Sequence, residues 1–155
     1  MKPHNNLEMA MVDMHGTAGA VGARWWEIYE NTFYVVPNGN QDKYIGVRAG
    51  SGVIFYNHVT GSANGGGGFI DLIEEDPGYP ALYQIGRGRN QELDPAYVWG
   101  NDTSMAVGSS SANVQANRDY YLSPKPGYTP YQYPHPMAAG ETAPRSPTNF
   151  RIVRQ

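Results

Sequence analysis

A seven-residue pattern that occurs twice in the chain constrains the fold more than any other feature. Glu27–Phe33 reads EIYENTF and Val53–Val59 reads VIFYNHV, with an asparagine at the same position of each. A repeat with a period in the twenties that is built from short strands is typical of a β-solenoid, whose successive turns stack in parallel. We therefore expect the two segments to lie side by side and to run in the same direction.

Polar residues close four of the strand-like segments at related positions. Asn31 and Asn57 belong to the repeat, and Asn101 follows the later strand-like run Tyr97–Gly100. Counting back from Asn101 by the separation between Asn31 and Asn57 leads to Glu75, which follows the apolar run Phe69–Ile73. Asparagine tolerates the left-handed backbone region that a sharp bend requires. We expect the three asparagines to form a hydrogen-bonded ladder at one corner of the stack, with Glu75 at the same corner of an intervening turn.

The other apolar runs are short, aromatic or β-branched, and bounded by Gly, Asn or Pro, which is the pattern of strands. The strands expected are Trp25–Tyr29, Thr32–Val36, Tyr44–Val47, Gly52–Tyr56, Gly68–Ile73, Ala96–Trp99 and Asp119–Leu122. Only Ala10–Met14 suits a turn of helix. The predicted fold is all-β, a short right-handed parallel β-helix.

An antiparallel β-sandwich is the alternative architecture. Asn38-Gly39 lies between the runs Phe33–Val36 and Tyr44–Val47, and Asn-Gly between strands is a strong hairpin signal. In a solenoid the same dipeptide would form the tip of a projecting loop. The sequence pattern keeps both architectures open.

The C-terminal part of the chain differs in composition. Seven of the twelve prolines fall between Ser123 and Thr148, interleaved with Tyr128, Tyr131 and Tyr133. Proline at this density disfavours helix and sheet and leaves an extended path. We expect residues 1–122 to form the β-helix turns with an N-terminal cap, and residues 123–155 to form a Pro/Tyr-rich strap and a terminal strand. A disordered linker is the alternative for the strap.

Charge and composition limit the partners. The net charge is −3, charged residues make up 16% of the chain, and cysteine is missing. A chain without a basic field does not suit a nucleic-acid partner, and disulfides and thiolate zinc sites are excluded. The sequence has neither an apolar membrane span nor a signal-peptide core. We expect no nucleic-acid or membrane partner, and an extracellular or cell-surface protein whose leader has been lost from this chain.

Several segments resemble turns of the right-handed parallel β-helix proteins of the pectate-lyase-like superfamily, in particular the closing part of uncharacterised bacterial members. These segments are Arg24–Phe33, Ile45–Asn57, Tyr97–Asn101, Arg118–Tyr121, Lys125–Tyr128 and Tyr133–Pro136. The resemblance covers about residues 24–136 and lies in the pattern of turns. It implies an extracellular module that binds polysaccharide or, in a longer parent, cleaves it as a polysaccharide lyase or a glycoside hydrolase-like enzyme.

Two departures from the family leave enzyme activity open. Enzymes of the family are longer than this chain, which has room for only four or five turns. Lyases of this type also hold calcium with several carboxylates, and no acidic cluster marks the matching strands of this sequence.

Four residues are candidates for catalysis. Asp13 and His15 lie two apart, so an extended chain would place them on one side as a base with its orienting acid. Glu27 alternates with apolar neighbours and is expected to face solvent, with Arg48 on the neighbouring turn as a partner for an anionic sugar. An ordinary surface ion pair or a satisfied turn is the alternative in each case. Besides these four, His58, after the corner residue Asn57, suits a proton shuttle or a solvent-facing spacer.

The expected binding patch combines arginine with aromatic rings. Sugar rings stack on aromatic planes while charged donors hold hydroxyl or carboxylate groups. The patch residues are Arg87, Arg89, Tyr83, Tyr97, Trp99 and Arg24. The run of Asp71, Glu74, Glu75 and Asp76 supplies oxygen ligands that would suit calcium, or forms a solvated acidic edge. No other cofactor is expected.

A structural or assembly protein, such as a tail-fibre segment or a self-stacking filament subunit, is the alternative function. A short solenoid has two open ends with unpaired backbone groups, and each end must be capped or paired with another copy. End-to-end self-association is expected if neither terminal segment covers an end.

Overall fold

The computed structural model describes residues 10–14, 25–35, 43–61, 69–73, 84–88, 90–109 and 111–130. The chain divides into a unit of residues 1–125 and a unit of residues 126–155. The first unit holds the strands β1 (Ala10–Met14), β2 (Trp26–Tyr29), β3 (Thr32–Val35), β4 (Lys43–Val47), β5 (Gly52–Phe55), β6 (His58–Gly61), β7 (Phe69–Leu72), β8 (Ala96–Trp99), β9 (Ala106–Gly108) and β10 (Tyr120–Tyr121). The described ranges contain no helix, and so none that could cross a membrane. Most of the predicted strap lies outside these ranges.

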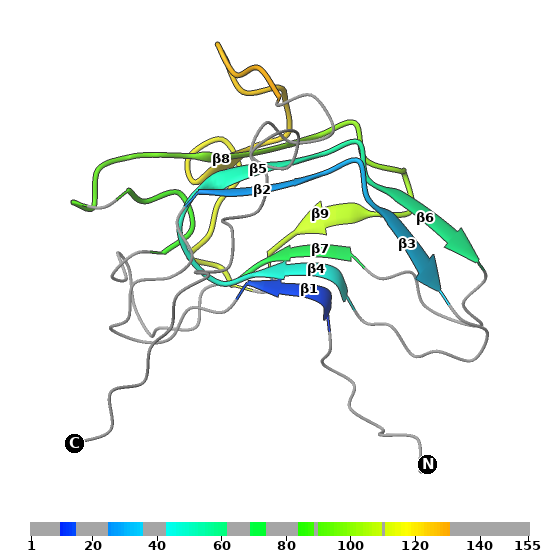
Figure 1. Cartoon of the computed structure of the whole chain (residues 1–155). Helices are drawn as coiled ribbons and strands as arrows, with labels where there is room; N and C mark the ends of the chain where they lie inside the picture. The colour runs from blue at the N-terminus through cyan, green and yellow to red at the C-terminus, as the bar shows by residue number, and fades with distance from the viewer. Residues whose placement is uncertain are drawn as a thin grey trace, which may run out of the picture. The chain divides into compact units, whose positions relative to one another are not determined.

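The strands form three sheets in which all pairs of named strands run parallel (Figure 1). The orders are β1-β4-β7-β9, β10-β8-β5-β2 and β3-β6. From β1 to β6 the chain passes twice through the three sheets in the same order, and from β7 to β10 it alternates between the first two, which is compatible with a β-solenoid. Parallel pairing contradicts the antiparallel β-sandwich, and the all-β prediction is confirmed for the described residues.

The two copies of the sequence repeat pair in the predicted direction. Glu27 lies opposite Val53 in the β2–β5 pair, and Phe33 lies opposite Val59 in the β3–β6 pair. The expected helical turn at Ala10–Met14 is wrong, because this segment is β1 and pairs in parallel with β4. Its alternation of more and less exposed residues suits a sheet edge, and pairing with β4 gives its backbone hydrogen-bond partners that a short isolated helix would lack.

The step to the third turn is longer than the repeat predicts. β5 pairs directly with β8, which sets Val53 opposite Tyr97. β7, expected to supply an intervening turn of this stack, instead pairs with β4 in another sheet. The prediction that Glu75 lies at the corner of an intervening turn assumed a constant turn length, and that assumption is wrong. Glu75 itself lies outside the described residues.

Apolar residues from facing sheets fill the interior between them. Ile28, Ile54 and Val98 come from one sheet, and Ile45 and Ile70 come from the sheet that faces it; all five are buried. Burial at roughly 25 cal/mol per Å² of apolar surface is the main stabilising contribution of such a core.

Trp26 enters this core beside a glycine. A Cβ on Gly52 would collide with the carbonyl and the ring of Trp26. The Trp26 indole Nε1 donates a hydrogen bond of 3.1 Å to the Ala49 carbonyl, which satisfies its buried N–H. Position 52 therefore has room only for glycine.

Candidate functional site

Asn31, Asn57 and Asn101 lie above one another and are hydrogen bonded in sequence. Asn31 Nδ2 donates to Asn57 Oδ1 at 2.9 Å, and Asn57 Nδ2 donates to Asn101 Oδ1 at 2.8 Å. The backbone N–H groups of Asn31 and Asn57 donate to the same two oxygens at 3.1 and 3.0 Å. Asn57 is fully buried, and its Nδ2 also donates to the Ile28 carbonyl.

The left-handed residue of each bend precedes the asparagine. Glu30, Tyr56 and Gly100 have φ values of 54°, 51° and 63°. The expectation that asparagine itself takes this conformation is therefore wrong. Asparagine is needed at the following position because its amide offers donors and an acceptor to neighbouring turns.

A row of stacked aromatic rings crosses the outer face of the β2-β5-β8 strands. Phe55 stacks on Tyr29, with centroids 4.7 Å apart and planes within 6°. Trp99 stacks on the other side of Phe55, with centroids 4.4 Å apart and planes within 3°. The Tyr56 ring meets Phe55 edge-on at 5.4 Å. The three stacked rings occupy the same register position on β2, β5 and β8, so the row ends with Trp99 on β8.

A hollow of about 250 Å³ lies at the Trp99 end of this row. β10 pairs with Ala96 and Tyr97 and ends at Tyr121, so this strand does not extend over Trp99. The hollow is lined by Val98, Trp99, Gly100, Asn101, Asp102, Thr103, Met105, Val107 and Leu122. It combines an aromatic and aliphatic lining with the polar groups of Asn101, Asp102 and Thr103.

His58 and Asp102 form a hydrogen-bonded pair that includes one residue of the hollow's lining. His58 Nδ1 lies 3.0 Å from Asp102 Oδ1, and the backbone N–H of Val59 donates to Asp102 Oδ2 at 2.8 Å. The Val59 N–H lowers the pKa of Asp102, and the His58 hydrogen bond lowers this pKa further against a small opposing effect of burial. In the tautomer with hydrogen on Nδ1, this nitrogen donates to the ionised Asp102, and Nε2 of the exposed histidine is then the acceptor nitrogen.

Comparisons with known proteins give no information about the function of this hollow. No family model, no curated protein and no solved structure matches the chain. The pectate-lyase-like resemblance consequently rests on the sequence pattern.

The predicted binding patch is divided in the structure. Tyr97 and Trp99 share the outer face of β8, but Tyr97 belongs to a second cluster. In that cluster Tyr97 stacks on Tyr121 at 5.4 Å, and Lys125 Nζ lies 4.9 Å from the Tyr97 ring and 5.2 Å from the Trp25 ring.

Arg87, another member of the predicted patch, bridges to Leu93 in an antiparallel contact. Its backbone N–H donates to the Gln84 carbonyl at 3.1 Å. Arg24, Tyr83 and Arg89 lie outside the described residues.

The candidate catalytic residues lie in separate sheets. Asp13 Oδ1 pairs with Arg48 Nε at 3.1 Å on the β1–β4 side, whereas Glu27 lies on β2 opposite Val53. His15 lies outside the described residues. The structure therefore joins Asp13 to Arg48 and leaves Glu27 on another sheet.

The acidic run does not form a described metal site. Asp71 is fully buried and lies 3.1 Å from Lys43 Nζ, so its carboxylate already has a cationic partner. Glu74, Glu75 and Asp76 lie outside the described residues. Across the described ranges, no group of three or more His, Asp or Glu side chains is arranged to hold a metal.

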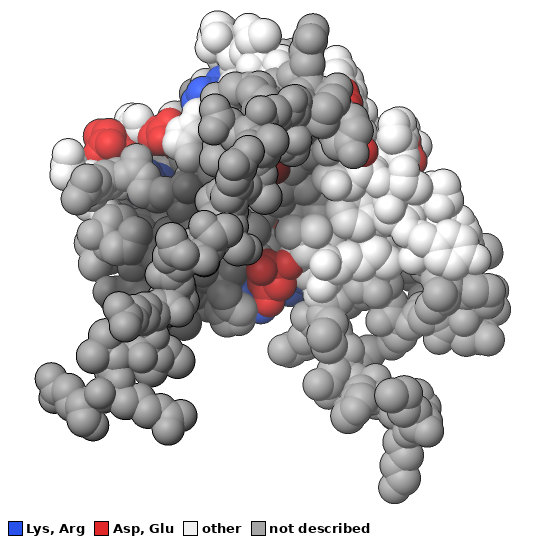
Figure 2. All heavy atoms as spheres, viewed as in Figure 1, with Lys and Arg blue, Asp and Glu red and all other residues white. Residues whose placement is uncertain are grey.

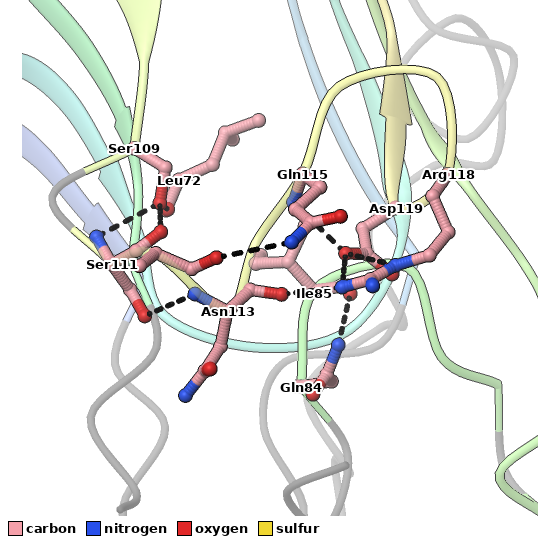
Figure 3. Close-up of polar contacts among 10 residues, drawn as sticks. Leu72, Gln84, Ile85, Ser109, Ser111, Asn113, Gln115, Arg118 and Asp119 are labelled. Carbon is pink, nitrogen blue, oxygen red and sulfur yellow. Dashed lines mark hydrogen bonds and ion pairs between the residues drawn. The ribbon is translucent and has the colours of Figure 1, made fainter. Parts of the chain in front are cut away.

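A second polar cluster holds the loop that leads into β10 (Figure 3). The fully buried Asp119 accepts hydrogen bonds from Arg118 Nε at 3.0 Å and Nη2 at 2.7 Å. The Gln115 backbone N–H donates to the same carboxylate oxygen at 2.9 Å, and Arg118 Nη2 also reaches the Asn113 carbonyl. The charged pair therefore anchors this loop from within.

Neither this cluster nor Asp102 was among the residues predicted from the sequence. For Asp102 a signal existed, because His58 and Asp102 have the same separation in the chain as Asn57 and Asn101. A residue that follows each corner asparagine is therefore expected to meet its counterpart on the next turn.

Proposed function

We propose that the chain is a right-handed parallel β-helix module of the pectate-lyase-like type that binds polysaccharide outside the cell. The parallel pairing of the named strands, with two passes through the three sheets from β1 to β6, supports the helix part of the proposal. Right-handedness is supported by the strong preference of parallel crossover connections, which are right-handed in about 98% of cases. The sequence resemblance supports the family.

The observation that carries the binding proposal is the hollow at the end of the aromatic row. Trp99 is held by Phe55 at 4.4 Å and also lines the hollow. A pyranose ring presents C–H groups that pack on an aromatic surface, and its hydroxyl groups need nearby polar partners. Asn101, Asp102 and Thr103 supply these partners. Carbohydrate therefore matches the mixture of apolar and polar groups better than a purely apolar ligand would.

The charge pattern favours a weakly charged glycan. Only 16% of the residues are charged and the net charge is −3. Figure 2 shows that blue and red atoms are sparse and scattered among the described residues of the face in view. Binding is consequently expected to change little with salt, because charge pairing contributes little to it.

The test is calorimetric titration with a panel of neutral and acidic oligosaccharides. Thr103→Trp places a large side chain at an exposed residue that lines the hollow. Ser104→Trp is the matched control, since Ser104 is an exposed neighbour outside the lining. We expect at least one glycan to bind the wild type and the Ser104 variant, and the Thr103 variant to lose binding. A wild type that binds no member of the panel, or equal binding by both variants, contradicts the proposal.

Cleavage of the bound glycan is a separate question, and His58 is the residue to test. A lyase would release an unsaturated product that absorbs in the ultraviolet from an acidic polysaccharide, measured with and without calcium. His58→Asn would abolish this signal if Nε2 is the base. A wild type without signal on any acidic glycan leaves the module as a binding protein.

Self-association is the second candidate function. β1, β2 and β3 each lie at an edge of their sheets, and open parallel edges can pair with another chain. Analytical ultracentrifugation separates the alternatives, because assembly predicts species that grow with protein concentration whereas the binding module alone predicts a constant mass.

A further inference from the structure

The asparagine ladder ends at Asn101, a residue that lines the hollow. In each of the two complete steps, a backbone N–H and an Nδ2–H of one asparagine converge on one amide oxygen. The distances are 3.1 and 2.9 Å for Asn31 to Asn57, and 3.0 and 2.8 Å for Asn57 to Asn101. The corner geometry therefore defines a position for an amide oxygen one step beyond each asparagine.

Asn101 is the last asparagine of the ladder. Its Oδ1 accepts from Asn57, and its Nδ2 donates to the Ile54 carbonyl at 3.2 Å. Among the residues that the structure describes, no acceptor meets the Asn101 backbone N–H or the second hydrogen of its Nδ2. These two donors correspond to the pair that Asn31 and Asn57 direct at the next amide oxygen.

The hollow lies on the side where that oxygen is expected. Each asparagine directs its donor pair toward the following turn, and after β8 the following turn is β10. Leu122, which comes directly after β10, and Asn101 both line the hollow. A group bound there would lie beside both Asn101 and Trp99, since both residues line the hollow.

We infer that the hollow selects an acetamido group, as found on N-acetylated sugars, whose carbonyl oxygen takes the place of the next amide oxygen in the ladder. This inference rests on the proposed function and names its ligand class. The acetamido methyl group suits the apolar lining that Met105, Val107 and Leu122 provide. A carboxylate oxygen matches less well, because the lining residue Asp102 carries a carboxylate, held by His58 and the Val59 N–H, whose negative charge would disfavour a second one nearby.

A second copy of this chain fits the donors less well than a small group does. A copy stacked on β8 would have to pair its own β2 along the whole strand to bring Asn31 over Asn101. β10 already pairs with Ala96 and Tyr97, the first half of β8. The available space thus favours a sugar substituent over another turn of β-helix.

The inference is tested with two matched neutral ligands on the full chain. One is the β-linked tetramer of N-acetylglucosamine, and the other is the equivalent glucose tetramer, which has a hydroxyl in place of each acetamido group. Two additional hydrogen bonds predict binding about tenfold tighter for the acetylated tetramer. Nuclear magnetic resonance should show downfield shifts of the Asn101 backbone and side-chain amide protons with that ligand alone.

Variants at the two ends of the ladder sharpen the comparison. Asn101→Asp keeps an acceptor for Asn57 but removes the Nδ2 donor, so it should reduce the preference for the acetylated tetramer. Asn31→Asp makes the same change at the far end and should leave the preference intact. If the Asn101 variant does not fold, the wild-type amide shifts decide the matter.

The outcomes distinguish this inference from the proposed function. Equal affinity for both tetramers, or binding without a shift at Asn101, overturns the acetamido assignment while glycan binding stands. Tight binding of other glycans with no binding of the acetylated tetramer does the same. Failure to bind every glycan of the panel overturns the proposed function as well.

Discussion

Trp99 lies almost parallel to Phe55, with ring centroids 4.4 Å apart and planes within 3°. The two residues are far apart in the chain, yet they occupy the same register of neighbouring strands. The stacking row therefore fixes where β8 sits on β5 and positions one wall of the hollow. Offset or parallel stacking of this kind adds about 0.5–1.5 kcal/mol to the burial of the rings.

Removal of the central ladder asparagine should be costly. Asn57→Ala deletes a fully buried amide that bonds Asn31, Asn101 and the Ile28 carbonyl. We expect a loss of about 3 kcal/mol in the free energy of unfolding, because buried partners are left unsatisfied. Asn31→Ala at the exposed end should cost about 1 kcal/mol. Urea denaturation measures both, and equal losses would show that the ladder contributes little.

Two glycines provide a matched test of backbone and space. Gly100 has a φ of 63°, and a Cβ there would collide with the Tyr56 ring. Gly100→Ala should destabilise the protein by about 2 kcal/mol or more. Gly108→Ala is the control, because a Cβ there has no atom within 4 Å. Thermal unfolding should rank the Gly100 variant well below the Gly108 variant, and the reverse order would refute the assigned bend.

Acid should weaken the contacts of Asp102. Its pKa in the folded chain is below the ordinary 3.8, through the Val59 N–H first and His58 second. The contribution of the ionised carboxylate is therefore fully present above that ordinary value and is lost as the pH falls through the lower folded pKa. Asp102→Asn should show a smaller loss of stability on acidification than the wild type. Denaturation midpoints at mildly acidic and strongly acidic pH test this, and parallel pH profiles would contradict it.

The Arg118–Asp119 pair should be strongly coupled. Arg118→Ala leaves a fully buried carboxylate with the Gln115 N–H as its remaining described donor and should cost about 3 kcal/mol. Asp119→Asn in the same background should restore part of the loss, because the buried group is then neutral. A double-mutant cycle measured by denaturation gives the coupling, and additive effects would argue against a direct interaction.

The parallel pairing was predictable because segments that pair in register resemble each other in sequence. Glu27–Phe33 and Val53–Val59 repeat each other because paired positions face the same environment. The same register places Asn31 and Asn57 in contact. β1 was not predictable as a strand, since the short run Ala10–Met14 fits more than one periodicity and its pairing with β4 decides the outcome.

The candidate site was less predictable from the sequence than the fold. The sequence predicted Trp99 and Tyr97 as surface aromatic residues of one patch. They lie in different surroundings because Tyr121 pairs with and stacks on Tyr97. Asp102 was not predicted because a constant step equal to that between Asn31 and Asn57 would place a different residue over His58, whereas the longer step between Asn57 and Asn101 brings Asp102 to it. Tertiary register, rather than local composition, creates the hollow.

The unequal steps between turns have a practical consequence. The chain from Val53 to its partner Tyr97 is much longer than the chain from Glu27 to its partner Val53, and both pairs keep the same parallel alignment. The connection from β7 to β8 thus tolerates extra length without displacing Asn101 from its place over Asn57. We expect this connection to accept an inserted peptide while the alignment of β5 with β8 is kept, whereas an insertion between Glu27 and Val53 would change the shorter step.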